Sequence, residues 1–343
     1  MRFHIFLGAA LMFAVGAGAQ AQDYTVSSIV TNSKDKHLAN PWGLSHLPKN
    51  HGGFNQWWVA DNVSGFSTLY SAKGQKVGLT IRIPAASGSG PGSPTGIANN
   101  PAAEEFVFAT LDGTLSEWSA YAAPVKPGNG CYQCHVSDAT IVVNNWASGA
   151  SYQGLTTATK GSTGALTYYA ANASGAVEAY DATTFARVEL PADAFTDSMI
   201  PSTYTPAGIQ AIGSRIFVTY NASAGGGTGY VDAFNPGGKL MLRLENGWFN
   251  QPWGVAASPA NFGSFSGMIL VGNTGSGWIG AYDPTTGAFA GFLQSGGYDL
   301  TLPGLWAIEF GDGAGQSGPT NTLYFNAGGA TQTTGEFGSI TAP

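Results

Sequence analysis

The stretch Gln251-Pro252-Trp253-Gly254-Val255 opens a unit whose pattern recurs through most of the 343-residue chain. Four short apolar runs follow from its glycine, at 254–257, 268–272, 278–282 and 289–293, and each is bounded by Gly, Pro, Asn or Asp. Short runs separated by such turn formers are typical of a four-stranded antiparallel meander. The unit therefore predicts a small four-stranded sheet.

Five more stretches share the start of this unit. They are Pro41-Trp42-Gly43-Leu44, Pro94-Thr95-Gly96-Ile97, Tyr152-Gln153-Gly154-Leu155, Pro206-Ala207-Gly208-Ile209 and Leu302-Pro303-Gly304-Leu305. The six glycines lie 53, 58, 54, 46 and 50 residues apart. Repeats of roughly 40 to 50 residues with four strands each are typical of β-propeller blades. We expect an all-β protein with six blades.

The last repeat has only three predicted strands, because residues 336–340 form the final apolar run before Pro343. At the other end, residues 24–30 read as a strand that precedes the first repeat. We expect this N-terminal strand to complete the last blade, because closure removes the open edges that a β-sheet must otherwise protect. A seven-bladed ring or two stacked sandwiches would fit the composition, but neither explains six starts and one extra strand.

The first residues have the pattern of a secretory signal. Arg2 precedes an apolar run at 5–15 and the small-residue site Ala19-Gln20-Ala21, so residues 1–21 are expected to be a signal peptide cleaved after Ala21. The run is too short for a membrane-spanning helix, so a membrane anchor is the weaker alternative. Residues 22–343 are then a single domain in the periplasm or outside the cell.

The composition narrows the classes of partner. Charged residues make up 10% of the chain and glycine occurs 50 times, which favours tight turns over long helices. With 13 basic and 20 acidic residues the net charge is −7, and loss of Arg2 makes it −8. Nucleic acid is not an expected partner, because no basic stripe is present to neutralise phosphates.

The two cysteines of the chain occur as Cys131-Tyr132-Gln133-Cys134-His135. This CxxCH motif is the attachment site of c-type haem, in which the thiols form thioethers and the histidine binds the iron. A disulfide between Cys131 and Cys134 is the main alternative in an oxidising compartment, and a zinc site would need a further ligand. A sixth haem ligand would come from His37, His46, His51, Met199, Met241 or Met268.

The motif lies in a predicted insertion, residues 121–137, between the third strand (114–119) and fourth strand (139–143) of the second blade. We expect this connection on the face opposite the channel mouth, near the outer rim. A haem there would stand apart from any site at the mouth.

Several segments carry a family resemblance. They are Asn40–His46 (NPWGLSH), Pro94–Asn100 (PTGIANN), Ala109–Trp118 (ATLDGTLSEW), Gln251–Gly267, Tyr282–Phe289 (YDPTTGAF) and Asn321–Gly329 (NTLYFNAGG). They resemble an uncharacterised family of secreted bacterial β-propellers, akin to the NHL-repeat and gluconolactonase-like propellers. The resemblance implies the propeller fold and no particular activity.

Polar residues that end the predicted second strands should gather at one mouth of the propeller channel. They are Asp61, Asn62, Asp112, Asn172, Asn221, Asn273 and Asn326, and the blade starts add Asn40, Trp42, Asn250, Trp253 and Trp306. Turn formation explains Asn and Asp at such positions, and packing explains the tryptophans. Alternatively, these groups form a small-molecule or cation site, for which Asp61, Asn62, Asn172, Asn221, Asn273 and Asn326 offer oxygen ligands suited to Ca²⁺.

Three functions follow from these observations. The first is an exported propeller with one covalent haem c at Cys131, Cys134 and His135, which transfers electrons or docks to a redox protein. The second is a binding or scaffold propeller with a Cys131–Cys134 disulfide and a ligand or cation at the mouth. The third is a metal-dependent hydrolase of the lactonase type. Gluconolactonase-like propellers hold their ion with Glu, Asn and Asp, and here no Glu occurs at a blade start.

Overall fold

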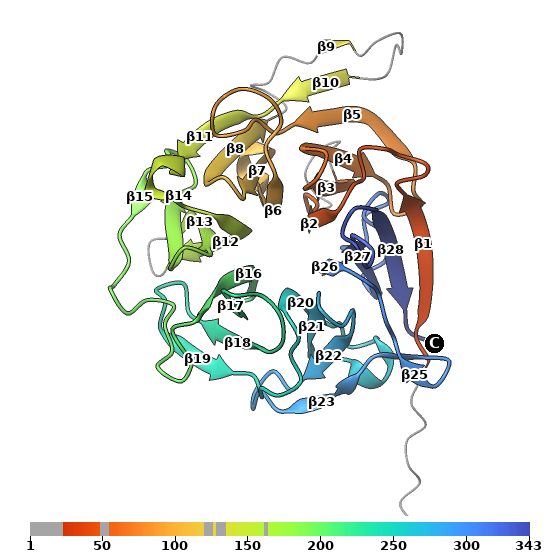
Figure 1. The fold of residues 1–343 in the computed structure, drawn as a ribbon. Coiled ribbons are helices and arrows are strands. Elements are labelled where there is room, and N and C mark those ends of the chain that lie inside the picture. The colour runs from red at the N-terminus through yellow and green to blue at the C-terminus, as the bar shows by residue number, and fades with distance from the viewer. Residues whose placement is uncertain (1–22, 49–54, 120–125, 128–134, 161–163) are drawn as a thin grey trace, which may run out of the picture.

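The computed structural model describes residues 23–48, 55–119, 126–127, 135–160 and 164–343, which form a ring of sheets around one axis (Figure 1). The six larger sheets are the blades, and the innermost strand of each lies nearest the axis. Helical structure in the described ranges is limited to the 3-10 turns η1 (Pro101–Ala103), η2 (Trp146–Ser148) and η4 (Gly263–Phe265). The all-β, six-bladed β-propeller that the repeats predicted is confirmed.

Blades I to III contain the first half of the strands. Blade I holds β2 (Pro41–Ser45), β3 (Trp57–Asp61), β4 (Phe66–Tyr70) and β5 (Lys76–Arg82). Blade II holds β6 (Pro94–Asn100), β7 (Glu105–Thr110), β8 (Thr114–Ser119) and β11 (Thr140–Asn144). Blade III holds β12 (Tyr152–Lys160), β13 (Ala165–Asn172), β14 (Val177–Asp181) and β15 (Arg187–Val188).

Blades IV to VI complete the ring. Blade IV holds β16 (Tyr204–Ile212), β17 (Arg215–Ala222), β18 (Gly229–Phe234) and β19 (Leu240–Arg243). Blade V holds β20 (Pro252–Ala257), β21 (Ile269–Asn273), β22 (Ile279–Tyr282) and β23 (Phe289–Phe292). Blade VI holds β26 (Leu305–Phe310), β27 (Thr322–Ala327), β28 (Glu336–Thr341) and β1 (Thr25–Thr31), and β24 (Gln294–Ser295) and β25 (Tyr298–Asp299) form a hairpin before it.

The repeat start coincides with a register shift in the innermost strand of each blade. In blade V, Pro252 pairs with Asn273 and Val255 pairs with Val271, so the residues between them bulge. In blade VI the same shift lies between Leu305 and Ile308. The sixth start is therefore Leu305-Trp306-Ala307-Ile308, and the prediction of Leu302-Pro303-Gly304-Leu305 was wrong. Ala307 stands where the other blades have glycine, so the glycine signal pointed three residues too early.

The repeated glycine lets neighbouring inner strands approach each other around the axis. A Cβ on Gly208 would lie 1.9 Å from the carbonyl oxygen of Trp253 in the next blade, and a Cβ on Gly96 would lie 2.2 Å from the nitrogen of Leu155. Such distances exclude any larger side chain without a shift of backbone. The close spacing of the inner strands thus depends on the absence of a side chain at these glycines, and not on a positive φ angle.

The blade strands are buried on both faces, which is why they read as continuous apolar runs. Trp57 and Trp58 are adjacent in β3 and point to opposite faces, because side chains alternate along a strand. Trp57 packs against Tyr324 of blade VI with ring centroids 4.8 Å apart, and Trp58 stacks on Phe106 of blade II at 3.9 Å. Six buried apolar clusters of the described residues fill the six spaces between neighbouring blades in this way.

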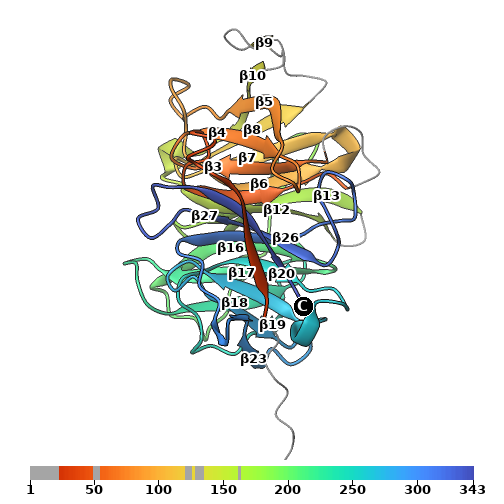
Figure 2. The ribbon, with the colours of Figure 1, turned by 90° about the vertical axis from the view of Figure 1, so that its right-hand side faces the viewer.

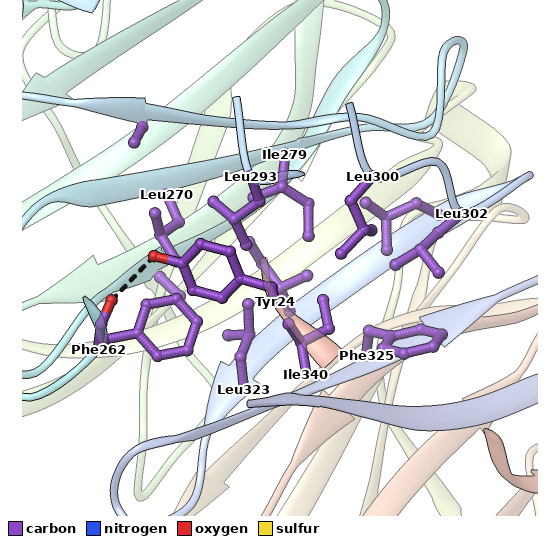
Figure 3. Packing of buried hydrophobic residues seen from close by; sticks show 14 of the residues in the cluster. Tyr24, Phe262, Leu270, Ile279, Leu293, Leu300, Leu302, Leu323, Phe325 and Ile340 are labelled. Carbon is purple, nitrogen blue, oxygen red and sulfur yellow. Dashed lines mark hydrogen bonds between the residues drawn. The ribbon is translucent and has the colours of Figure 1, made fainter. Parts of the chain in front are cut away.

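The N-terminal strand closes the ring as predicted. β1 pairs antiparallel with β28, from Thr25 opposite Thr341 to Thr31 opposite Glu336. Tyr24 anchors its start in the apolar cluster between blades V and VI (Figure 3). The Tyr24 hydroxyl donates a hydrogen bond of 2.9 Å to the carbonyl oxygen of Phe262. The first and last strands of the described chain therefore share one sheet.

Blade I has two outer strands that the sequence did not predict. β10 (His135–Asp138) runs parallel to β5, and β9 (Lys126–Pro127) pairs with β10 at the outer edge of the ring (Figures 1 and 2). The segment that leaves blade II after β8 thus adds to the sheet of blade I before it returns to β11. Arg82 forms an ion pair with Asp138 at 2.7 Å, and the Trp118 indole donates to the Ser137 hydroxyl at 2.9 Å. The ion pair lies within the sheet of blade I, whereas the bond from Trp118 joins blade II to it.

Candidate functional site

Three tryptophans close the axis on the face where the second and third strands are joined. Trp42, Trp253 and Trp306 occupy the same position of the repeat start in blades I, V and VI, and each is 7% or 8% exposed. Trp42 and Trp306 stack with centroids 3.7 Å apart, and Trp253 meets both rings edge-on. The rings pack on one another at the axis, within the buried apolar cluster that also contains Trp57 and Phe337, so packing accounts for their positions.

A cavity of about 380 Å³ lies over this indole cluster. Its larger side chains come from five blades: Trp42, Gln153, Asn221, Gln251, Trp306 and Gln332. Hydroxyl groups and small residues complete the wall: Thr205, Ser223, Thr274, Ala173, Ala222 and Gly225. We call this space the mouth cavity. Concave sites with aromatic walls and a few converging polar groups are the usual form of small-ligand sites.

Three residues of the mouth cavity carry polar atoms that have no hydrogen-bond partner among the described residues. The atoms are Nε1 of Trp42, Oδ1 of Asn221 and Oγ1 of Thr274, and all three are shielded from solvent. A buried polar atom left unpaired costs about 1 to 3 kcal/mol. Atoms of the same kind also lie away from the cavity, such as Oδ1 of Asp61, Oγ of Ser116 and the Tyr282 hydroxyl.

Three of the six described non-glycine residues with a positive φ lie at or beside the same cavity. Gln251 and Gln332 line the mouth cavity with φ angles of 55° and 54°, and Asn40 has a φ of 47° beside it. The side-chain oxygen of Asn40 accepts a hydrogen bond of 3.0 Å from the Trp306 indole. Residues other than glycine rarely adopt this left-handed conformation, and such strain gathers at functional sites.

Only some of the predicted mouth residues line the mouth cavity. Asn221, Trp42 and Trp306 line the mouth cavity, whereas the amides of Asn172 and Asn273 bond the backbone of their own turns. Oδ1 of Asn172 accepts from the Ser151 and Ser174 nitrogens, and Oδ1 of Asn273 accepts from the Asn250 nitrogen at 2.8 Å. Asn172 also donates to the Glu178 carboxylate at 3.1 Å, so both side chains are engaged within their own blades.

The remaining predicted residues of this face contact other parts of the fold. Asn62 donates to the carbonyl oxygen of Pro94, and Asn326 donates to that of Gly43, so both amides link neighbouring blades. Asp61 accepts a hydrogen bond of 2.8 Å from Thr68, and burial raises the pKa of its carboxyl well above the usual range. Asp112 accepts from the Ala86 nitrogen at 2.6 Å. None of these four lines the mouth cavity.

The sequence did not predict five residues that line the mouth cavity: Gln153, Thr205, Gln251, Thr274 and Gln332. Gln153 carried a usable signal, because it holds the repeat position that tryptophan holds in blades I, V and VI. Thr205 lies in the inner strand β16, and Gln251, Thr274 and Gln332 lie in connections whose approach to the axis depends on the closed ring. Local sequence does not reveal that approach.

The haem motif lies mostly outside the described ranges. Cys131 and Cys134 are not described, and His135 is described only as the first residue of β10. There its backbone pairs with Leu79 of blade I and with Pro127 of β9. The motif therefore ends at the outer rim, on a strand held to blade I.

A polar cluster lies at the other end of the axial strands. His46 Nε2 lies 3.5 Å from Oε1 of Glu309, and its Nδ1 lies 4.0 Å from Oδ2 of Asp312. Burial raises the pKa of Glu309 to about 7. Among the described residues, no group of three or more His, Cys, Asp or Glu side chains has an arrangement suited to a metal ion.

A carboxyl pair lies in a groove at the outer side of blade IV, which Asp197, Asp232 and Arg243 help to line. Arg243 donates to both oxygens of Asp197, one of them at 2.8 Å, and this bonding lowers the pKa of Asp197 to about 2. Burial, and then the charge of Asp197, raise the pKa of Asp232 to about 8. The pair therefore holds one proton at neutral pH.

Comparison with known proteins adds relatives without an assigned activity. No family model matches the chain. Two uncharacterised proteins of Acanthamoeba polyphaga mimivirus are similar to it: R648 is 29% identical over 79% of this chain and 68% of its own length, and L690 is 28% identical over 89% and 81%. These relatives are viral proteins, and not the secreted bacterial propellers that the sequence motifs suggested.

Solved structures with the same fold are far more distant in sequence. A glucose dehydrogenase aligns with a TM-score of 0.59 at 13% identity, over 93% of this chain and all of that one. A protein of unknown function from Bacteroides thetaiotaomicron gives 0.58 at 12% identity, over 94% and 76%. The PQQ-bound aldose sugar dehydrogenase of Streptomyces coelicolor gives 0.55 at 13%, over 94% and 100%.

At such identities the likeness shows the fold alone. The ring of blades, its closure and these structures define the chain as a β-propeller. Among the described residues, no helix has the length and apolar character needed to cross a membrane.

Proposed function

We propose that this protein is a binding propeller that holds a small molecule in the mouth cavity. The observation that carries the proposal is the convergence of amide and hydroxyl side chains from blades III to VI on one cavity that also has indole walls. A ligand with hydrogen-bonding groups can pair with these side chains while its apolar parts contact the indoles.

The strained backbone at Gln251 and Gln332 supports the same function. The closed ring holds Gln251 and Gln332 in backbone conformations that an isolated loop would not keep. The site is therefore formed before the ligand binds. Preorganised sites lose less conformational entropy on binding.

The proposal is tested by a thermal-shift screen of a diverse small-molecule library that includes Ca²⁺ salts. A ligand that binds only the folded state raises the melting temperature by mass action. Ala173→Trp places a large ring in the wall of the mouth cavity and should abolish the shift. Ala186→Trp, on an exposed turn of the same blade, is the matched control and should keep it.

A shift that both tryptophan variants retain would place the ligand elsewhere. If no compound raises the melting temperature of the natural protein more than that of the Ala173→Trp variant, the binding function is wrong. A shift with Ca²⁺ that Asn221→Ala removes would identify the ligand as a cation.

We propose as a second function that the exported protein carries one covalent haem c and passes electrons to a redox partner. The supporting observation is the CxxCH motif at Cys131, Cys134 and His135, followed at once by β10. Each thiol would add across a vinyl group of the haem to form a thioether, a step that requires no oxidant. The bound haem would supply a one-electron redox centre, and the pairing of β10 with β5 would keep it close to blade I.

Expression with a signal sequence in a host that matures c-type cytochromes tests this second function. A covalent haem gives a Soret band that survives denaturation and acid–acetone extraction. Cys131→Ala combined with Cys134→Ala should remove the band and leave the melting temperature of the propeller unchanged. A colourless protein with a mass two hydrogens below the sequence value would show a disulfide in place of haem.

A further inference from the structure

We infer that the ligand of the mouth cavity is an uncharged, hydroxyl-rich molecule of the saccharide class. This inference rests on the proposed binding function and adds the chemical nature of the ligand. It follows from three properties of the cavity wall: its lack of charge, its pairing of donors with acceptors, and its indole surface.

The wall carries no charge. None of the described residues that line the mouth cavity has an ionisable side chain. A carboxylate, phosphate or ammonium group that enters such a space loses its hydration without gaining an opposite charge, which is unfavourable by several kcal/mol. The cavity therefore selects against charged ligands.

The wall is nevertheless polar, and it offers donors and acceptors together. Gln153, Asn221, Gln251 and Gln332 carry amides, and Thr205, Ser223 and Thr274 carry hydroxyls. Amides and hydroxyls each both donate and accept hydrogen bonds. A ligand hydroxyl also does both, so it can pair with these amides and hydroxyls in either direction. A purely apolar ligand would displace water from these polar groups without replacing its hydrogen bonds.

The indoles of Trp42 and Trp306 give the same cavity an apolar surface. The C–H face of a sugar ring can pack on this surface while its hydroxyls reach the amides around it. The volume of about 380 Å³ is at the lower end of the range for ligand pockets, roughly 300 to 1,000 Å³. The cavity thus suits a ligand of one or two sugar rings.

The test is a titration of the purified full-length protein, followed by tryptophan fluorescence and calorimetry. The uncharged probes are glucose, N-acetylglucosamine, cellobiose and maltose. Glucuronate and glucosamine are their charged counterparts, and indole is the apolar probe. At least one uncharged sugar should bind. If that sugar is glucose, its affinity should be at least tenfold higher than that of glucuronate.

Variants place the binding in the cavity. Asn221→Ala should weaken the sugar by about tenfold, the effect expected for one lost hydrogen bond. Gln251→Gly removes a lining amide and suits the positive φ of that position, so it should weaken binding without unfolding the chain. Trp248→Ala is the matched control, because Trp248 is 46% exposed and stacks on Phe289 away from the cavity.

The possible outcomes separate the ligand class from the binding function. If glucuronate, glucosamine or indole binds and Asn221→Ala weakens it while no uncharged sugar binds, the saccharide class is wrong and the mouth site stands. If sugars bind and only Trp248→Ala weakens them, the inference is wrong because the site is on the outer surface. If none of the seven probes binds, the saccharide inference fails, and the library screen with Ala173→Trp decides the binding function independently.

Discussion

At the scale of single residues, the axial glycines set how closely the blades pack. Gly208→Ala would place a Cβ 1.9 Å from the Trp253 carbonyl oxygen, so the inner strands of blades IV and V would have to separate. Overpacking of this kind costs about 1 to 3 kcal/mol. We expect a fall of several degrees in melting temperature, measured by circular dichroism.

The control for this substitution is Gly175→Ala, in a turn where a Cβ meets no atom within 4 Å. It should leave the melting temperature within about one degree, since surface changes are usually worth less than 0.5 kcal/mol. Equal effects of the two substitutions would show that the close approach of the inner strands is not limiting.

Also at the residue scale, Asp232 makes stability depend on pH. Its pKa is about 8 in the folded protein, against 3.8 for an ordinary aspartate, so the folded state keeps a proton that the unfolded state releases. The free energy of unfolding should therefore fall between about pH 4 and pH 8, by up to about 1.4 kcal/mol per pH unit. Asp232→Asn removes this titration.

Urea unfolding at pH 5, 6.5 and 8 checks the effect. Asp232→Asn should show a shallower fall with pH and should be the more stable protein at pH 8. Glu105 and Glu309 have pKa values of about 7 and contribute in the same direction, so the difference between the two proteins is the informative quantity. Identical slopes would contradict the assignment to Asp232.

At the scale of elements, β1 holds the ring closed. Without residues 23–31, β28 becomes an exposed edge strand and the cluster around Tyr24 opens. Exposed edges pair with other chains, so the truncated protein should melt at a lower temperature and aggregate. Light scattering during a thermal ramp measures the temperature at which the protein unfolds and the extent to which it aggregates.

A synthetic peptide of residues 23–31 gives the matched rescue. Added in excess, it should pair with β28 and raise the melting temperature of the truncated protein. A peptide with Tyr24→Ala should rescue less, because it lacks the ring that fills the cluster. A truncated protein that melts like the full chain would refute the closure by β1.

The outer strand β10 is held by a buried bond to blade II and by an exposed ion pair within blade I, and the buried bond should matter more. Arg82 and Asp138 have side chains 50% and 41% exposed, so Arg82→Ala should cost less than about 1 kcal/mol. Ser137 is 1% exposed and accepts from the Trp118 indole, so Ser137→Ala should cost more, about 1 to 3 kcal/mol. Urea midpoints compare the two, and a larger loss from Arg82→Ala would reverse this order.

At the scale of the whole molecule, closure makes the six blades cooperate. Every blade shares an apolar cluster with both neighbours, and the sheet of blade VI contains strands from both ends of the described chain. An open array of repeats can fray from its ends, whereas a closed ring exposes no terminal blade. We expect a single unfolding transition in guanidinium chloride.

Two probes test this cooperativity. Tryptophan fluorescence reports on the nine indoles, three of which lie at the axis, and circular dichroism reports on all strands. Their transitions should coincide for the full chain and separate for the chain that lacks β1. Separate transitions in the full chain would mean that the blades unfold independently.

The sequence by itself determined the number of blades, the four strands of the basic blade and the closing strand. These features are written in local patterns: a glycine where inner strands touch, apolar runs where strands are buried on both faces, and turn formers between them. Even the sixth blade was found, although Ala307 replaces its glycine and shifted the predicted start to Gly304.

Only the tertiary structure decided which polar residues share a space. Asn172, Asn221 and Asn273 have the same local setting in sequence, yet only Asn221 lines the mouth cavity. Gln251 and Thr274 join it from blade V, and Gln332 joins it from a turn of blade VI. The pairing of β10 with β5 likewise joins residues 56 positions apart, such as His135 and Leu79. Local patterns follow from the geometry of one strand, whereas a cavity depends on how a closed ring brings distant turns to a common axis.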